Sequence, residues 1–203
     1  MDLYKYYSNP EQLNRYAEAD DIVPSRVYAK AKSGTQLTLK QINTLAKGAE
    51  YAYQYARDVL TGPFPAGEDA IAKDAWYAYH YARNVLTGPF PKGEDAIAKD
   101  TKYAYQYTRD VIKGPFPKGE NAIAKDAWDA YYYALDVLTG PFPKGENVIA
   151  KDAWYAYHYA YNVIKGPFQK GENAIANNAE YAYQYARYVL KLPEEQAQQW
   201  GAK

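Results

Sequence analysis

Residues 75–82 read Ala-Trp-Tyr-Ala-Tyr-His-Tyr-Ala. Close copies of this stretch stand at 49–56, 101–108, 127–134, 153–160 and 179–186. Each copy begins 26 residues after the previous one, without insertion or deletion. Six copies therefore run from Lys47 to about Pro193, and half a copy (39–46) precedes them. A fixed period of this length is typical of repeat proteins whose stacked units share a core.

Each unit is predicted to contain two helices. The longer one follows Asp74, a residue type that caps helix N-termini, and the same position is held by Asp100, Asp126 and Asp152. Gly88 followed by Pro89 predicts where this helix stops. A short helix is expected over roughly 91–98, where a proline at the first position costs no hydrogen bond.

The helical period assigns one face of the long helix to the core. With Ala56 at the centre and 100° per residue, Ala49, Ala52, Tyr53, Val59 and Leu60 lie within about 60° of it. This face is small apart from one tyrosine and two aliphatic residues, so neighbouring helices can approach closely. Since two short helices cannot bury an apolar face alone, the units are expected to stack.

We therefore predict an all-α protein, an α-solenoid of six two-helix repeats with capping helices at both ends. Residues 1–46 would form an N-terminal helical cap with a partial repeat, beginning with a helix at Asn9. The six tandem repeats would occupy 47–192, and 193–203 would form the C-terminal cap. No linker-like or strongly charged run divides the chain, which favours one elongated domain.

Composition excludes several classes of function. The 203 residues contain 24 basic and 24 acidic side chains and no cysteine. The absence of cysteine excludes disulfides, iron–sulfur clusters and thiolate zinc sites, and fits a cytoplasmic location. No apolar run is long enough to cross a membrane, so no membrane partner is expected. No basic stripe follows the repeats, which makes nucleic acid an unlikely partner.

No catalytic constellation is visible, and we expect no enzyme, no metal and no cofactor. The two histidines, His80 and His158, occupy the same repeat position three units apart, too far to share a metal. The recurring acidic residues from Glu68 to Glu172 occupy equivalent environments, whereas acid–base catalysis needs two carboxylates in different ones. They are expected to stabilise the first turn of each short helix.

The tyrosine content is abnormal: 25 Tyr against 5 Phe and 4 Trp. Two tyrosine positions, typified by Tyr53 and Tyr55, never vary among the six copies. Their invariance predicts packing within and between repeats, where each hydroxyl needs a partner. An alternative role, as pockets for a small ligand between repeats, would fall on the second of these positions. Its candidate residues are Tyr81, Tyr107, Tyr133 and Tyr159.

Positions that vary among the copies are the better candidates for recognition, because packing does not fix them. Two such positions lie four residues apart, on one helix face. There the sequence pairs Trp76 with His80, Trp128 with Tyr132, and Trp154 with His158, while Tyr161 replaces the arginine usual nearby. Trp and Tyr dominate interface hot spots, which predicts a partner-binding surface. Packing of each Trp against the neighbouring helix is the competing interpretation.

The unit at 88–100, Gly-Pro-Phe-Pro-Lys-Gly-Glu-Asp-Ala-Ile-Ala-Lys-Asp, resembles a tandem repeat of bacteriophage and large-virus hypothetical proteins. That repeat reads G-R-W-P-E-A-E-x-x-I-x-K-D and then A-x-x-Y-A-x-x-V-I-K-G. The matching residues are Gly88, Pro91, Glu94, Ile97, Lys99, Asp100, Tyr107, Val111, Ile112, Lys113 and Gly114. Pro89 and Phe90 replace its Arg-Trp pair. The resemblance covers about three quarters of the chain and implies a viral origin and a helical array, with no activity attached.

The sequence thus favours a non-enzymatic scaffold that binds a macromolecule, most simply a protein. If the chain is viral, the partner would be a host protein, with interference or anti-defence as its purpose, in the cytoplasm of the infected cell. One alternative is a sponge for a small ligand or nucleotide. Another is a self-assembling structural viral protein, in which case a homo-oligomer is expected.

Overall fold

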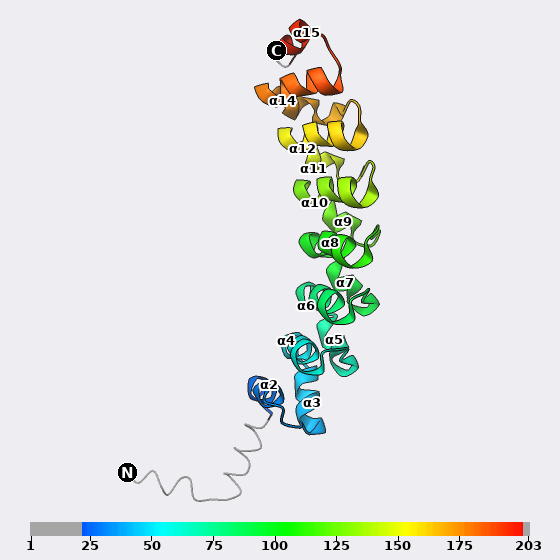
Figure 1. Ribbon diagram of the computed structural model, residues 1–203. Coiled ribbons are helices and arrows are strands. Elements are labelled where there is room, and N and C mark those ends of the chain that lie inside the picture. The colour runs from blue at the N-terminus through cyan, green and yellow to red at the C-terminus, as the bar shows by residue number, and fades with distance from the viewer. Residues whose placement is uncertain (1–21, 201–203) are drawn as a thin grey trace, which may run out of the picture. The chain divides into compact units, whose positions relative to one another are not determined.

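The computed structural model describes residues 22–200, and all regular elements within them are helical. The helix expected at Asn9 lies outside this range. The described chain is an α-solenoid of regularly repeated helix pairs, as the period predicts (Figure 1). It divides into two compact units, residues 22–94 and residues 95–200, and the division falls within the second repeat.

The first unit begins with two helices that precede the full repeats. Helix α2 packs against α3 and α4, and α4 in turn packs against α5 and α6. The elements are α2 (Pro24–Lys32), α3 (Leu39–Ala46), α4 (Ala49–Tyr55), η2 (Ala56–Leu60), η3 (Pro65–Gly67), α5 (Glu68–Ile71), α6 (Ala75–Tyr81), η4 (Ala82–Leu86) and η5 (Pro91–Gly93).

The second unit contains four long helices, each packed against the next, with a short helix behind each of the first three. After α7 (Glu94–Ile97) come α8 (Thr101–Tyr107), η6 (Thr108–Ile112), α9 (Glu120–Ile123), α10 (Ala127–Tyr132), η7 (Tyr133–Leu138), α11 (Glu146–Ile149), α12 (Ala153–His158), η8 (Tyr159–Ile164), η9 (Gln169–Gly171), α13 (Glu172–Ala176), α14 (Ala179–Gln184), η10 (Tyr185–Val189) and α15 (Glu194–Gln199). Helix α15 packs on α14 at the position predicted for a C-terminal helix.

The predicted N-caps are confirmed. The carboxylate of Asp74 accepts the backbone N–H of Tyr77 at 3.1 Å, and those of Asp100, Asp126 and Asp152 accept the N–H three residues later at 2.9–3.0 Å. Asn178 caps α14 in the same way, at 3.2 Å. Each bond satisfies one donor that a helix start leaves without a partner.

In the first five full repeats the long helix ends two residues before the predicted glycine. Each long helix finishes in a π segment, η2 in the first full repeat, and in these five repeats the residue before the glycine is left-handed. Thr61 has φ 50°, and its equivalents include Thr87, Lys113 and Lys165. The N–H of Thr61 bonds to the carbonyl of Ala56 five residues back, as in a π turn, and the N–H of Gly62 reaches the same carbonyl at 3.1 Å.

The π segment also displaces the end of the predicted core face. Ala52, Tyr53 and Ala56 are buried as expected, but Leu60 is 41 % exposed and Val59 is only partly buried. The spacing of 100° per residue belongs to the α-helix and does not extend through a π segment. The prediction that Leu60 lies in the core was therefore wrong.

The long and short helices of a repeat approach closely at a second glycine. A Cβ at Gly145 would lie 2.6 Å from Cδ1 of Phe142 and 2.7 Å from Cβ of Ala130. Gly93 in the first unit shows the same geometry against Phe90 and Ala78. Only glycine fits there, because the phenylalanine ring and the alanine methyl fill the space of a side chain.

The invariant tyrosines join neighbouring repeats through their hydroxyls. The Tyr81 hydroxyl accepts the N–H of Phe64 at 2.8 Å and donates to Glu68 at 3.3 Å. The same pattern joins Tyr133, Tyr159 and Tyr185 to the preceding repeat. At the other invariant position, the Tyr53 hydroxyl accepts from the Asn84 amide of the next repeat at 2.9 Å. The predicted packing role of the invariant tyrosines is confirmed at these residues.

Candidate partner-binding surface

In each of three repeats, the variable tryptophan packs against the aromatic residue four positions later, with the two rings tilted by 47–48°. The ring centroids of Trp76 and His80 are 4.1 Å apart. Those of Trp154 and His158 are also 4.1 Å apart, and those of Trp128 and Tyr132 are 4.6 Å apart. The helical spacing of i and i+4 therefore brings together each pair predicted from the sequence.

Each tryptophan also packs on the invariant tyrosine of the preceding repeat. Trp76 meets Tyr53 edge to face with centroids 5.7 Å apart, and Trp128 meets Tyr105 in the same way at 5.3 Å. Trp76 and Trp128 nevertheless remain 39 % and 43 % exposed. The packing interpretation is therefore confirmed at Trp76 and Trp128, and the exposed part of each ring stays accessible to solvent.

In the second unit these contacts extend over successive repeats. Trp154 packs on Tyr131 with centroids 5.6 Å apart, and Tyr131 also contacts Tyr132 at 4.9 Å. One repeat further, Tyr157 stacks between two rings, Tyr161 at 5.9 Å and Tyr181 at 5.8 Å. We call the partly exposed residues Trp128, Tyr132, Trp154, His158 and Tyr161 the aromatic surface. Trp76 and His80 form a separate pair in the first unit.

Burial affects the histidine of the aromatic surface. It lowers the pKa of the His158 imidazole, so the ring stacked on Trp154 is neutral at physiological pH. In the first unit, His80 Nδ1 lies 3.4 Å from the Asn84 amide nitrogen. These environments suit aromatic stacking. Among residues 22–200, no group of three or more His, Asp or Glu side chains is placed to hold a metal ion.

The tyrosines proposed as alternative ligand sites lie inside the core. Tyr81, Tyr107, Tyr133 and Tyr159 are each 0 % exposed. Burial raises the pKa of Tyr81, Tyr133 and Tyr159 to about 12, so their hydroxyls keep the proton that they donate to glutamate. A ligand would have to displace the packing between repeats to reach these rings.

The repeated glutamates are engaged in the same contacts. Glu120 accepts from the Tyr133 hydroxyl at 3.2 Å and pairs with Lys144 at 2.8 Å. Glu146 accepts from Tyr159 at 3.4 Å and pairs with Lys170 at 2.7 Å. Each of these carboxylates therefore contacts a tyrosine and a lysine of the next repeat, beyond the helix-dipole role expected from the sequence.

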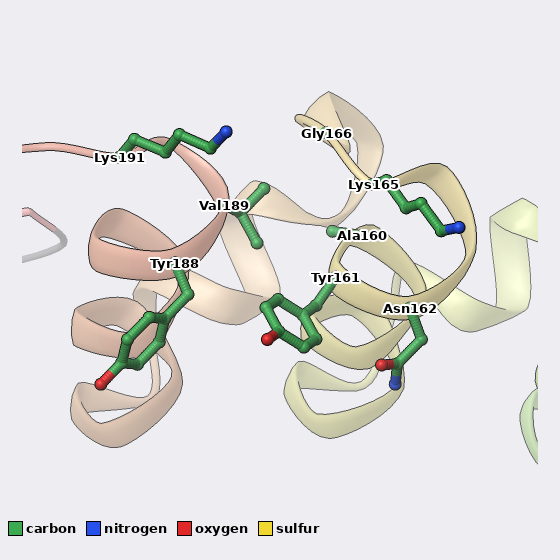
Figure 2. Close-up of a pocket in the computed structure, with 8 residues that line it drawn as sticks. All are labelled: Ala160, Tyr161, Asn162, Lys165, Gly166, Tyr188, Val189 and Lys191. Atoms are coloured by element: carbon green, nitrogen blue, oxygen red, sulfur yellow. The ribbon is translucent and has the colours of Figure 1, made fainter.

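An open pocket of about 380 Å³ lies between η8 and η10, beside Tyr161 (Figure 2). Tyr188, on its other side, is 56 % exposed, and Tyr161 is 49 % exposed. Lys165 and Lys191 line the pocket as well. Only Tyr161 was singled out from the sequence. A signal was present for Tyr188, which replaces the Asp or Asn of every other copy, but not for the two lysines, whose repeat position holds Thr and Lys equally often.

Asp129 is a second residue that sequence reasoning missed. It replaces the tyrosine that the other five copies carry at this position, and it is 7 % exposed. Burial, with Asp126 and Asp100 nearby, raises the pKa of its carboxyl to about 7, and Lys102 opposes the rise. No side-chain hydrogen bond of this carboxyl is found among the described residues.

Comparison with known proteins returns no match: no family model fits the chain, and no curated protein or solved structure is significantly similar to it. The described helices include none that is both long and apolar enough to cross a membrane.

Proposed function

We propose that this chain is a non-enzymatic repeat scaffold that binds a protein partner through the aromatic surface. The observation that carries the proposal is the exposure of Trp128, which keeps 43 % of its area in solvent although it packs against other rings; Trp76, in the separate pair of the first unit, keeps 39 %. Large, rigid aromatic residues supply contact area at low conformational cost and dominate protein interfaces. The stack of repeats would hold them in register.

The difference between invariant and variable repeat positions supports a binding role. Residues that never vary, such as Tyr133 and Tyr159, are buried and hydrogen-bonded. Residues that vary, such as Trp128 and Tyr161, are exposed. The repeated acidic side chains, typified by Glu120, are engaged in pairs that hold the repeats together. A catalytic site would need side chains in different environments, whereas a binding surface needs exposed side chains on a rigid stack of repeats.

That the partner is a host protein rests on the resemblance of the repeat to viral repeats. The viral origin, the anti-defence role and the cytoplasmic location belong to the same proposal. The proposal therefore directs the search for a partner to cell lysates, both bacterial and eukaryotic, because the resemblance covers bacteriophages and large viruses.

The test is a pull-down from nuclease-treated lysates with the full chain. The variant for comparison carries Trp76→Glu, Trp128→Lys and Trp154→Glu, residues that Glu50, Lys102 and Glu180 already place at this repeat position. A second variant carries His80→Gln, Tyr132→Gln and His158→Gln, after Gln54, Gln106 and Gln184. Lys102→Glu is the matched control. Because every substitution is one that the stack accepts elsewhere, the variants are expected to fold.

The proposal expects a stoichiometric partner on the wild-type chain and on the Lys102→Glu control, reduced at least about tenfold on both aromatic variants. Equal capture by folded variants would contradict a role for the aromatic surface. If the chain captures nothing and its native mass shows a homo-oligomer, self-assembly would replace partner binding as the proposed function.

A further inference from the structure

The pocket between η8 and η10 combines apolar and basic groups. Figure 2 shows the rings of Tyr161 and Tyr188 on one side and Lys165 and Lys191 on the other, with Val189 between them. The pocket holds about 380 Å³, the size of one or two side chains, and opens to solvent. Its remaining polar side chain, Asn162, donates its amide to the Tyr131 hydroxyl at 2.9 Å.

The two lysines are free to pair with a ligand. Within the described residues, Lys165 and Lys191 form no ion pair. Lysines elsewhere in the repeats do pair, since Lys144 lies 2.8 Å from Glu120 and Lys170 lies 2.7 Å from Glu146. No ion pair among residues 22–200 therefore compensates the positive charge at this pocket.

Comparison with the other repeats shows which residues distinguish this pocket. The position of Tyr188 is acidic or amide-bearing in every other copy, as Asp58, Asn84, Asp110, Asp136 and Asn162. The position of Lys165 and Lys191 is Thr61, Thr87 and Thr139 in three of the other four copies. At the equivalent place in the first unit, the Asp58 carboxylate pairs with Arg57 and accepts from Tyr28. Between η8 and η10, Tyr188 replaces an acidic or amide residue, Tyr161 replaces an arginine, and both lysines stand where other copies mostly have threonine.

We propose that this pocket binds a short segment of the partner protein in which an apolar side chain stands beside an acidic residue. The apolar side chain would lie between Tyr161 and Tyr188 over Val189, and the carboxylate would face Lys165 and Lys191. The charge selects an acidic segment, because a basic one would meet two unpaired ammonium groups. This inference rests on the proposed function and names the chemistry of the partner.

The test is selection of a phage-displayed library of random peptides, about 12 residues long, on the full chain, followed by affinity measurement with the selected synthetic peptides. Two variants restore the residues of other repeats: Lys165→Thr with Lys191→Thr, and Tyr161→Arg with Tyr188→Asp. Lys113→Thr, the same exchange at another repeat, is the matched control. Circular dichroism melting confirms that each variant is folded.

The expected result is enrichment of peptides with Asp or Glu next to an aromatic or aliphatic residue. Their affinity should fall at least about tenfold in both pocket variants and stay unchanged in Lys113→Thr. Selected peptides without acidic residues, unchanged affinity in the variants, or no enrichment at all would overturn the proposal. Adenosine monophosphate is tested in parallel. Its binding without peptide binding, lost in the same variants, would also overturn the proposal by assigning the pocket to small anions.

Failure here is distinguishable from failure of the proposed function. If peptides bind and are lost in Trp128→Lys but kept in Tyr161→Arg with Tyr188→Asp, partner binding stands and the pocket is not its site. If the lysate partner is also captured equally by the Trp and pocket variants, the aromatic surface itself is contradicted.

Discussion

The hydroxyl of Tyr159 accepts a hydrogen bond from the backbone N–H of Phe142, seventeen residues earlier, at 2.7 Å. The same hydroxyl donates to Glu146, and the Tyr159 ring contacts Phe168 with centroids 5.1 Å apart. One fully buried side chain thus joins the loop of the preceding repeat to the loop of its own. Repetition of this contact explains why the tyrosine at this position is invariant.

Replacing Tyr159 with Phe should destabilise the fold while keeping the ring. The change leaves the buried N–H of Phe142 without its acceptor, at an expected cost of about 1–3 kcal/mol in the free energy of unfolding. Urea titration followed by circular dichroism measures this cost. Tyr161→Phe is the control, because Tyr161 is exposed and its loss of a hydroxyl should change stability by less than about 0.5 kcal/mol. Equal effects of the two changes would refute the assigned role.

The two glycines of a repeat should differ in their tolerance of alanine. Gly145→Ala places a methyl 2.6 Å from the Phe142 ring and should destabilise by about 1–3 kcal/mol. Gly140→Ala meets only the Leu138 carbonyl oxygen, at 3.9 Å, and should be close to neutral. Thermal melting of the two single variants gives the comparison. A tolerated Gly145→Ala would mean that the helices of the repeat separate more easily than this contact implies.

Much of the fold was predictable because every repeat contains the same local sequence signals. The 26-residue period, the aspartate caps and the glycine–proline stops are short-range signals, and six copies reinforce them. The exposed end of η2 was not predictable in this way. A π segment has no residue signature of its own, so the helical period places Leu60 in the core, although it is 41 % exposed.

The candidate surface was predictable only in part. The pairing of Trp154 with His158 follows from helical spacing. Trp154 also packs on Tyr131 of the preceding repeat. This contact depends on how two repeats stack, and the periodicity of one helix does not predict it. The pocket beside Tyr161 is formed by two repeats, and Tyr188 and Lys191 become neighbours of Tyr161 only after stacking.

Asp129 should make stability fall as the pH rises. Its carboxyl has a pKa of about 7 in the folded chain, against an ordinary value of 3.8. The folded state therefore holds a proton that the unfolded state releases. The resulting stability is fully present below about pH 4 and is lost as the pH rises through about 7. His158 acts in the opposite direction, because its pKa is lowered by burial.

The contribution of Asp129 is isolated by comparison with Asp129→Asn, melted at intervals from pH 5 to pH 8. The melting temperature of the variant, relative to that of the wild type, should rise steadily from pH 5 to pH 8. Asp129→Tyr, which restores the residue of the other copies, should show the same trend. A difference that does not change with pH would mean that the carboxyl stays ionised in the folded chain.

The aromatic surface should contribute little to stability relative to its effect on binding. Trp128→Lys removes an edge-to-face contact with Tyr105, worth about 1 kcal/mol, and leaves the hydrogen-bonded stack intact. Melting should therefore shift by only a few degrees. Loss of a cooperative melting transition would show that folding depends on Trp128 as on a core residue, despite the exposure of its ring.

The most direct test of the account is the dissociation constant of the captured partner for the wild-type chain and for the chain with Trp76→Glu, Trp128→Lys and Trp154→Glu. It is measured by biolayer interferometry at a temperature at which both are folded. If the aromatic surface is the binding site, the variant should bind the partner at least about tenfold more weakly, and Lys102→Glu should bind it as tightly as the wild-type chain. Equal affinity of the variant and the wild-type chain would contradict the aromatic surface as the site of binding.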